Sequence, residues 1–305
     1  MNLLFKKNTI YILSFTILLF AVFYYCYSYY SNYNSYRNEM LPNSMNYEEN
    51  YISCRNNGVA LDSQDSCEKI MIEYENNYDL FYHFSNSIHE GSQFFPFFSF
   101  IFIMIPSVFL FVQKTKKGNV KNQLVRQSYH SFLKKEYKES IKSCFILPAV
   151  LVMFLLIAGL YTSFKISNPQ TYQYYDISIF ENVIGSQFLF FIILLITFFI
   201  QSVFFMNVAY SVSYYCKNLL FTFFSCVVTF FLIELGLECI YAILHMIFGD
   251  KFMDMSVIML TAIWNYDGVY NVIIPLIINS IYAILSFYIM CRIYNSKEKM
   301  VTKCE

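Results

Sequence analysis

One apolar stretch of the sequence carries ionisable side chains at helical spacing. Glu234 and Glu238 are one helical turn apart, and His245 follows seven residues later, so all three can share one face of a helix. Ionisable groups inside an apolar helix are costly to bury, and they often line a transport pathway or a contact between subunits. A carboxylate near the membrane interface reaches water at little cost, so simple solvation is the alternative.

Other reactive residues fit no complete enzyme motif. His89-Glu90 is followed by Gly91-Ser92-Gln93, so the second histidine of the zinc motif His-Glu-x-x-His is missing. The chain has 8 glycines, and no two of them are spaced as a Gly-x-x-x-x-Gly-Lys or Gly-x-Gly-x-x-Gly loop requires. We therefore expect no enzyme activity and no cofactor. If ATP drives this protein, another chain binds the nucleotide.

Two of the 9 cysteines, Cys54 and Cys67, lie in a polar stretch predicted to face outward. An oxidising environment would permit a disulfide between them, and a pair of free thiols is the alternative. The other seven are scattered singly along apolar segments and the C-terminal tail. Their distribution favours packing over metal binding.

The apolar residues are gathered into long blocks that have to cross a membrane. The chain is 57% hydrophobic and only 14% charged. Each block approaches or exceeds the roughly 20 residues that cross the hydrocarbon layer, where backbone groups must be satisfied within a helix. The sequence therefore predicts an all-α, polytopic bundle of about six transmembrane helices, at Thr9–Tyr30, Phe94–Val112, Cys144–Phe164, Phe188–Tyr210, Leu219–Phe248 and Val272–Cys291. Gln201 and Asn207, in the fourth block, are expected to form interhelical hydrogen bonds.

The charges predict which ends face the cytoplasm. Of the 21 lysines and arginines, 16 fall in the two termini and in alternate connections between blocks. Basic residues beside a span resist translocation, so these parts should be cytoplasmic in a multi-pass protein of the cell membrane. The region 31–92 is rich in acidic residues and should form a large extracytoplasmic loop. This organisation divides the chain into 1–30, 31–92 and a five-helix portion, 93–305.

The region after the fifth block should turn back within the membrane. Two apolar segments that surround Gly249-Asp250 are too short for each to cross. A re-entrant hairpin at about 239–264, buried against protein, would satisfy their backbone groups.

The connection 114–142 is basic and has helical periodicity after Gly118. One predicted face carries Leu124, Val125, Ser128, Tyr129, Phe132, Leu133 and Ile141, while Lys134, Lys135 and Lys138 lie off that face. We expect an amphipathic helix at the membrane surface. It could be held there by anionic lipid, or it could dock a cytoplasmic partner.

The order of these parts resembles the membrane subunits of ABC transporters of the ABC-2 type. The residues that match the family's pattern after its second span are Gln113, Gly118, Leu124, Arg126-Gln127-Ser128 and Lys134-Lys135. The family often has Glu in place of Gln113 and Pro-Ser-Arg in place of residues 126–128. It also has paired short helices between its last two spans, like the hairpin predicted here.

The resemblance implies that about Lys121–Lys138 is a coupling helix seated in a groove of an ATPase. The implied coupling residues are Gly118, Leu124, Arg126, Tyr129, Phe132, Leu133, Lys134 and Lys135. The chain would be an exporter permease for peptides, lipids or drugs. It would pair with an ABC ATPase and a second permease, identical or related, within the lipid bilayer, and it would bind no nucleic acid. The alternative is a sensory, binding or immunity protein whose acidic outer domain recognises a ligand.

Overall fold

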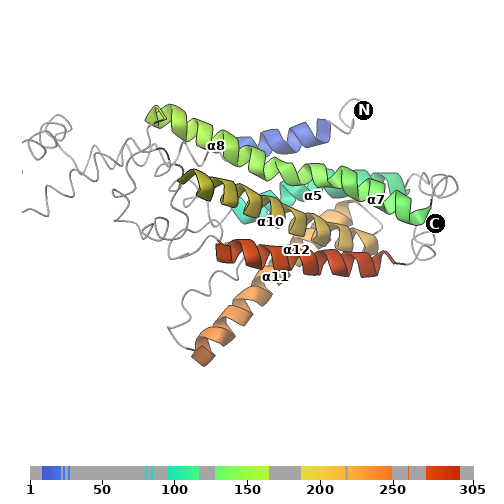
Figure 1. Ribbon diagram of the computed structural model, residues 1–305. Coiled ribbons are helices and arrows are strands. Elements are labelled where there is room, and N and C mark those ends of the chain that lie inside the picture. The colour runs from blue at the N-terminus through green and yellow to red at the C-terminus, as the bar shows by residue number, and fades with distance from the viewer. Residues whose placement is uncertain are drawn as a thin grey trace, which may run out of the picture.

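The computed structural model describes residues 9–21, 23, 24, 27, 80, 84, 95–116, 128–164, 187–216, 219–248, 260 and 273–295. All regular structure in this part of the chain is helical (Figure 1). A helix at Thr9–Ala21 comes first. The others are α5 (Phe95–Lys116), α7 (Tyr129–Ser140), the 3-10 helix η1 (Ile141–Phe145), α8 (Ile146–Thr162), α10 (Gln187–Tyr215), α11 (Leu219–Phe248) and α12 (Ile273–Ile293).

Four helical stretches are long and apolar enough to cross a membrane: Tyr129–Leu160, Phe191–Tyr215, Leu219–Ile247 and Pro275–Ile293. Thr9–Ala21 and Phe97–Phe109 are apolar but shorter. The all-helical prediction is therefore confirmed for the described residues, and four of the helices have the length and composition of membrane spans. A count of six crossings, the fold of the 31–92 loop and the side on which each terminus lies stay predictions.

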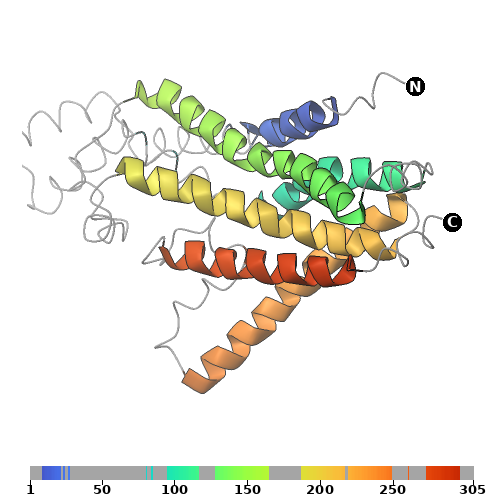
Figure 2. The ribbon, with the colours of Figure 1, turned by 45° about the vertical axis from the view of Figure 1, so that its right-hand side comes forward.

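Helix α10 is the central element of the bundle. It packs against α5, α8, η1, α11 and α12, and in Figure 2 it runs between the helices that flank it. An aromatic cluster joins three of these helices, because the ring of Phe100 lies 5.5 Å from that of Phe205 and 4.9 Å from that of Phe230. Such ring pairs add about 0.5–1.5 kcal/mol each beyond the area that they bury.

The described part of the amphipathic segment continues from α7 through η1 into α8 without a break. Ser128 caps α7, since its Oγ accepts a hydrogen bond of 3.3 Å from the backbone N–H of Ser131. The chain then passes through η1 into α8, and Figure 1 shows α7 and α8 as one continuous rod. From Tyr129 onward, the predicted amphipathic helix is therefore continuous with α8. Its location at the membrane surface stays a prediction.

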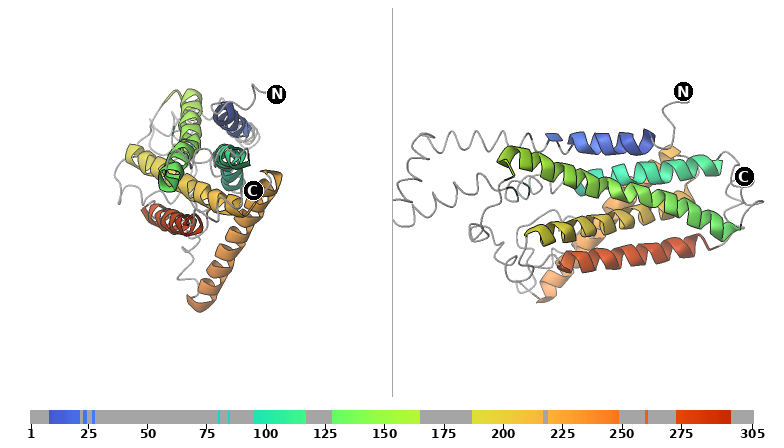
Figure 3. Two further views of the ribbon diagram at one scale, coloured as in Figure 1. Left: turned by 90° about the vertical axis from the view of Figure 1, so that its right-hand side faces the viewer. Right: turned by 45° about the horizontal axis from the view of Figure 1, so that its top comes forward.

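The first half of α11 packs in the bundle, and the second half extends away from it. Its first half contributes Thr222, Cys226 and Phe230 to the interior, but none of the described side chains after Phe230 is buried. Apart from Glu234, Glu238 and His245, the far half is largely apolar, and Met246 near its end is 81% exposed. Figures 1 and 3 show α11 running obliquely away from α12. In a membrane, lipid or another protein must cover this half.

Two hydrogen bonds bring distant parts of the chain together at one end of the bundle. The Tyr11 hydroxyl donates to the carbonyl of Glu139 at 3.1 Å, and the Tyr129 hydroxyl donates to the carbonyl of Tyr294 at 2.8 Å. The first helix therefore begins, and α12 finishes, beside α7. We refer to this region as the α7 end.

Candidate functional site at the α7 end

The side of α7 that faces the bundle is a stripe of mixed polarity. Phe132, Glu136 and Ser140 recur every four residues, as one face of a helix requires, and all three are buried. Phe132 is 0% exposed and belongs to the main hydrophobic core. It therefore anchors α7 to the protein.

Asn207 of α10 connects α7 to α12. Its Oδ1 accepts a 3.1 Å hydrogen bond from the Tyr137 hydroxyl. Its Nδ2 donates to the carbonyl of Ala283 at 3.3 Å and to the Ser286 hydroxyl at 3.2 Å. The amide is 0% exposed, so these bonds replace all contact with water. The predicted interhelical role of Asn207 is confirmed.

A second set of polar contacts lies closer to the end of α12. The hydroxyls of Ser140 and Tyr210 are hydrogen-bonded to each other, and the Tyr294 hydroxyl donates to the carbonyl of Tyr210 at 3.0 Å. Burial raises the pKa of Tyr294 well above its usual value, so its hydroxyl keeps its proton and remains a donor at neutral pH. Helices α7, α10 and α12 are thus linked by specific, directional bonds as well as by packing.

Substitution of Asn207 by alanine should destabilise the bundle by about 2 kcal/mol, because the hydroxyl of the half-buried Tyr137 loses its acceptor and the buried Ser286 loses a donor. Chemical denaturation in detergent, followed by circular dichroism, measures this loss. Ser211→Ala, one turn further along α10, is the matched control, since among the described residues the Ser211 hydroxyl bonds within its own helix, to the carbonyl of Asn207. Equal losses for the two variants would show that Asn207 does not hold the helices together.

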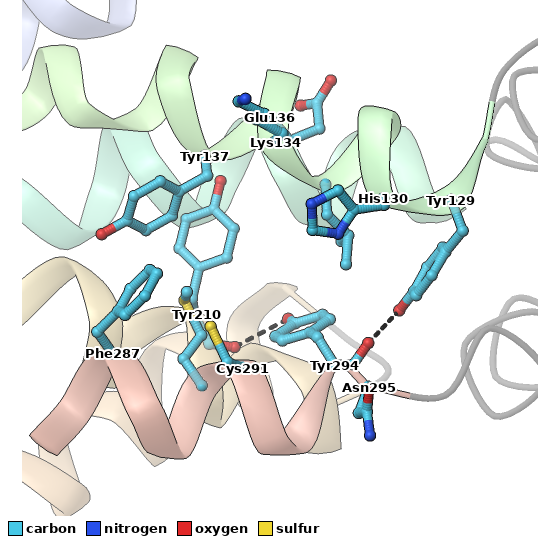
Figure 4. Close-up of a pocket in the computed structure, with 12 residues that line it drawn as sticks. Tyr129, His130, Lys134, Glu136, Tyr137, Tyr210, Phe287, Cys291, Tyr294 and Asn295 are labelled. Carbon is cyan, nitrogen blue, oxygen red and sulfur yellow. Dashed lines mark hydrogen bonds between the residues drawn. The ribbon is translucent and has the colours of Figure 1, made fainter.

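A cavity of about 530 Å³ lies between α7, α10 and α12. Its lining residues are Tyr129, His130, Leu133, Lys134, Glu136, Tyr137, Tyr210, Phe287, Met290, Cys291, Tyr294 and Asn295. The rings of Tyr137, Tyr210 and Phe287 cluster at one side of it in Figure 4. Tyr137 and Phe287 lie 5.5 Å apart between ring centroids. A volume of this size suits a small amphipathic ligand or part of a larger one.

The opposite side of α7 presents a row of lysines. Lys135, Lys138 and Lys142 are three and four residues apart, and all are exposed, as is Ser131 on the same side. None of these residues lines the cavity. We call Lys135, Lys138 and Lys142 the free basic face.

The predicted coupling residues fall into separate groups. Phe132 is buried, and Leu133 is half-buried against the core. Tyr129 and Lys134 line the cavity, and Lys135 belongs to the free basic face. Gly118, Leu124 and Arg126 lie outside the described residues, as do Cys54 and Cys67.

Glu234, Glu238 and His245 lie on one helix, α11, but in different surroundings. Glu234 is half-buried against the bundle, and its carboxylate accepts a hydrogen bond from the backbone of Leu260. Glu238 is exposed. His245 lies near the ring of Tyr241, 6.0 Å away, on the half of α11 that leaves the bundle. Among the described residues, no group of three or more His, Cys, Asp or Glu side chains is arranged to hold a metal ion.

Leu260 is the one described residue of the returning arm of the predicted hairpin. It is buried, and its carbonyl accepts a 2.8 Å hydrogen bond from Nε2 of Gln201, near the middle of α10. The Oε1 of Gln201 and one carboxylate oxygen of Glu234 have no hydrogen-bond partner among the described atoms. Polar groups of α10 and α11 therefore meet at Leu260. Gln201 was predicted to bond between helices, but the bond that it forms is to a turn residue instead.

Glu136, Ser140, Tyr210 and Tyr294 are parts of the α7 end that the sequence analysis missed. The spacing of Phe132, Glu136 and Ser140 places them on one helix face, but a glutamate on a helix is normally expected to face the solvent. Comparison with protein-family models, curated proteins and solved structures gives no match to this chain.

Proposed function

We propose that this chain is the membrane subunit of an ABC-type transporter, and that its free basic face receives a separate ATPase subunit. The carrying observation is that Lys135, Lys138 and Lys142 are exposed together on a helix whose opposite side is locked into the bundle. Lysines presented in a row on a rigid helix complement an acidic groove, and they speed encounter with it.

The linkage of α7 to its neighbours supports a coupling role. A displacement of α7 is passed to α10 and α12 through Asn207, and to the first helix through Tyr11. The displacement also reaches α8 directly, because α7, η1 and α8 form one continuous helical stretch. Closure of the ATPases would therefore move several spans together and open a path outward for a peptide, lipid or drug.

A photo-crosslinking amino acid at Lys138 tests this proposal in the membranes of the native cell. The expected product contains a chain with a Gly-x-x-x-x-Gly-Lys-Ser or -Thr nucleotide-binding loop, identified by mass spectrometry. The same crosslinker at Leu285, an exposed position of α12 away from the free basic face, is the control and should not capture that chain. Capture of no nucleotide-binding chain at Lys138, or equal capture at both positions, would contradict the proposal.

A further inference from the structure

We propose that the cavity between α7, α10 and α12 binds an anionic phospholipid, with one acyl chain inside the cavity and the phosphate at His130 and Lys134. This binding needs no ATPase, so it holds or fails independently of the transporter proposal. It would be a lipid site built into the α7 end.

The interior of the cavity suits an acyl chain. Leu133, Phe287 and Met290 supply aliphatic and aromatic surface, and the ring of Tyr137 lies against that of Phe287. Apolar cavities of this kind are poorly hydrated, and hydrocarbon fills them readily. The volume of about 530 Å³ is too large for the protein to close by small side-chain movements.

The cavity opens onto a surface that faces lipid. Phe287 and Cys291 line it and are themselves exposed, and the neighbouring side chains of α12, Ile284, Tyr288 and Ile289, are each more than half exposed. An apolar surface around the opening is continuous with the bilayer. Membrane lipid is therefore the most concentrated apolar molecule that can enter.

The charges at the rim select the headgroup. His130 and Lys134 lie one turn apart on α7, both exposed, and His130 extends toward α12 in Figure 4. Arg292, also exposed, adds positive charge at the same end of α12. Glu136 is the one acidic residue in the lining, and its side chain is buried on the core side of α7. Basic residues beside a span favour anionic over zwitterionic lipid, and each contributes about a fivefold preference.

Native mass spectrometry of the full chain in detergent tests the proposal, with dioleoylphosphatidylglycerol and dioleoylphosphatidylcholine supplied at equal concentration. The wild type should retain the anionic lipid about 25-fold more than the zwitterionic one, about fivefold for each of Lys134 and Arg292. Lys134→Gln should lower this preference about fivefold. Lys138→Gln removes the same charge from the free basic face and should keep most of the preference, so an equal loss in both variants would overturn the assignment to the cavity.

Filling the cavity tests where the acyl chain lies. Cys291→Trp should lower retention of both lipids about fivefold or more, whereas Ile289→Trp, on the neighbouring exposed surface outside the lining, should not. Cys291→Leu is a smaller second variant if tryptophan prevents folding. Unchanged retention in the Cys291 variants would refute the site. Displacement of the lipid by inorganic phosphate would indicate a simple anion site. If the protein retained lipid only after removal of residues 296–305, the chain's own C-terminal segment would be the occupant of the cavity. Either result overturns the proposal.

Discussion

Phe132→Ala should lower the free energy of unfolding by about 3–5 kcal/mol, the range observed when a fully buried phenylalanine is truncated in a packed core. The ring is 0% exposed, and α7 also carries two polar links to α10, from Tyr137 to Asn207 and between Ser140 and Tyr210. Loss of the ring would leave a cavity under α7 and loosen these links together. Denaturant unfolding of the purified protein in detergent measures the effect.

Phe221→Ala provides the comparison, because this phenylalanine is on α11 and is 60% exposed. Its loss should cost less than about 1 kcal/mol, as for most changes at exposed positions. If the two variants were equally stable, Phe132 would not be an anchor. A charged residue at position 132 should prevent folding altogether. A partner that fails to bind such a variant therefore says nothing about the coupling surface.

Reversal of charge on the free basic face should weaken ATPase binding about a hundredfold in the triple variant Lys135→Glu, Lys138→Glu, Lys142→Glu. Three lost pairs at roughly 1 kcal/mol each give a change of this size. All three side chains are exposed, so the fold should be retained, with a midpoint of unfolding close to that of the wild type. Binding of the ATPase identified by crosslinking, measured at two salt concentrations, gives the loss and its electrostatic origin.

Arg292→Glu is the matched control for this triple variant. Arg292 is exposed at the same end of the bundle, but its guanidinium lies against Tyr288 of α12 and away from the free basic face. Its reversal should weaken binding only slightly. A triple variant that binds the ATPase as tightly as the wild type would show that the ATPase does not use the free basic face.

The positions of the apolar helices could be predicted from the sequence, because the membrane leaves few alternatives to a helix of sufficient length. Leu219–Phe248 was predicted to the residue, and α12 differs from its prediction by one residue at the start and two at the end. Helix α10 runs to Tyr215, beyond its predicted end at Tyr210. In this added stretch Tyr214 packs against Tyr294, with the ring centroids 5.1 Å apart. That contact joins residues far apart in the chain, and no local pattern indicates it.

The arrangement around α7 could be predicted only in part. Periodicity identified the helix and placed the lysines off its apolar face. It could not show that the inner face includes Glu136 and Ser140, since a polar residue becomes a suitable interior residue only when a partner such as Tyr210 faces it. The cavity was also beyond prediction, because its walls come from three helices that are distant in sequence.

The oblique course of α11 should make the slope of this helix depend on the thickness of the bilayer. At 1.5 Å per residue, the 21 residues of α12 extend about 32 Å, close to one hydrocarbon layer, whereas the 30 residues of α11 extend about 45 Å. An apolar helix of that length fits the same layer only by leaning. Beyond Leu237, no described side chain of α11 belongs to the hydrophobic core or packs against it. A thinner or thicker membrane would therefore change the tilt of α11 first, before that of the helices that pack along their full length in the bundle.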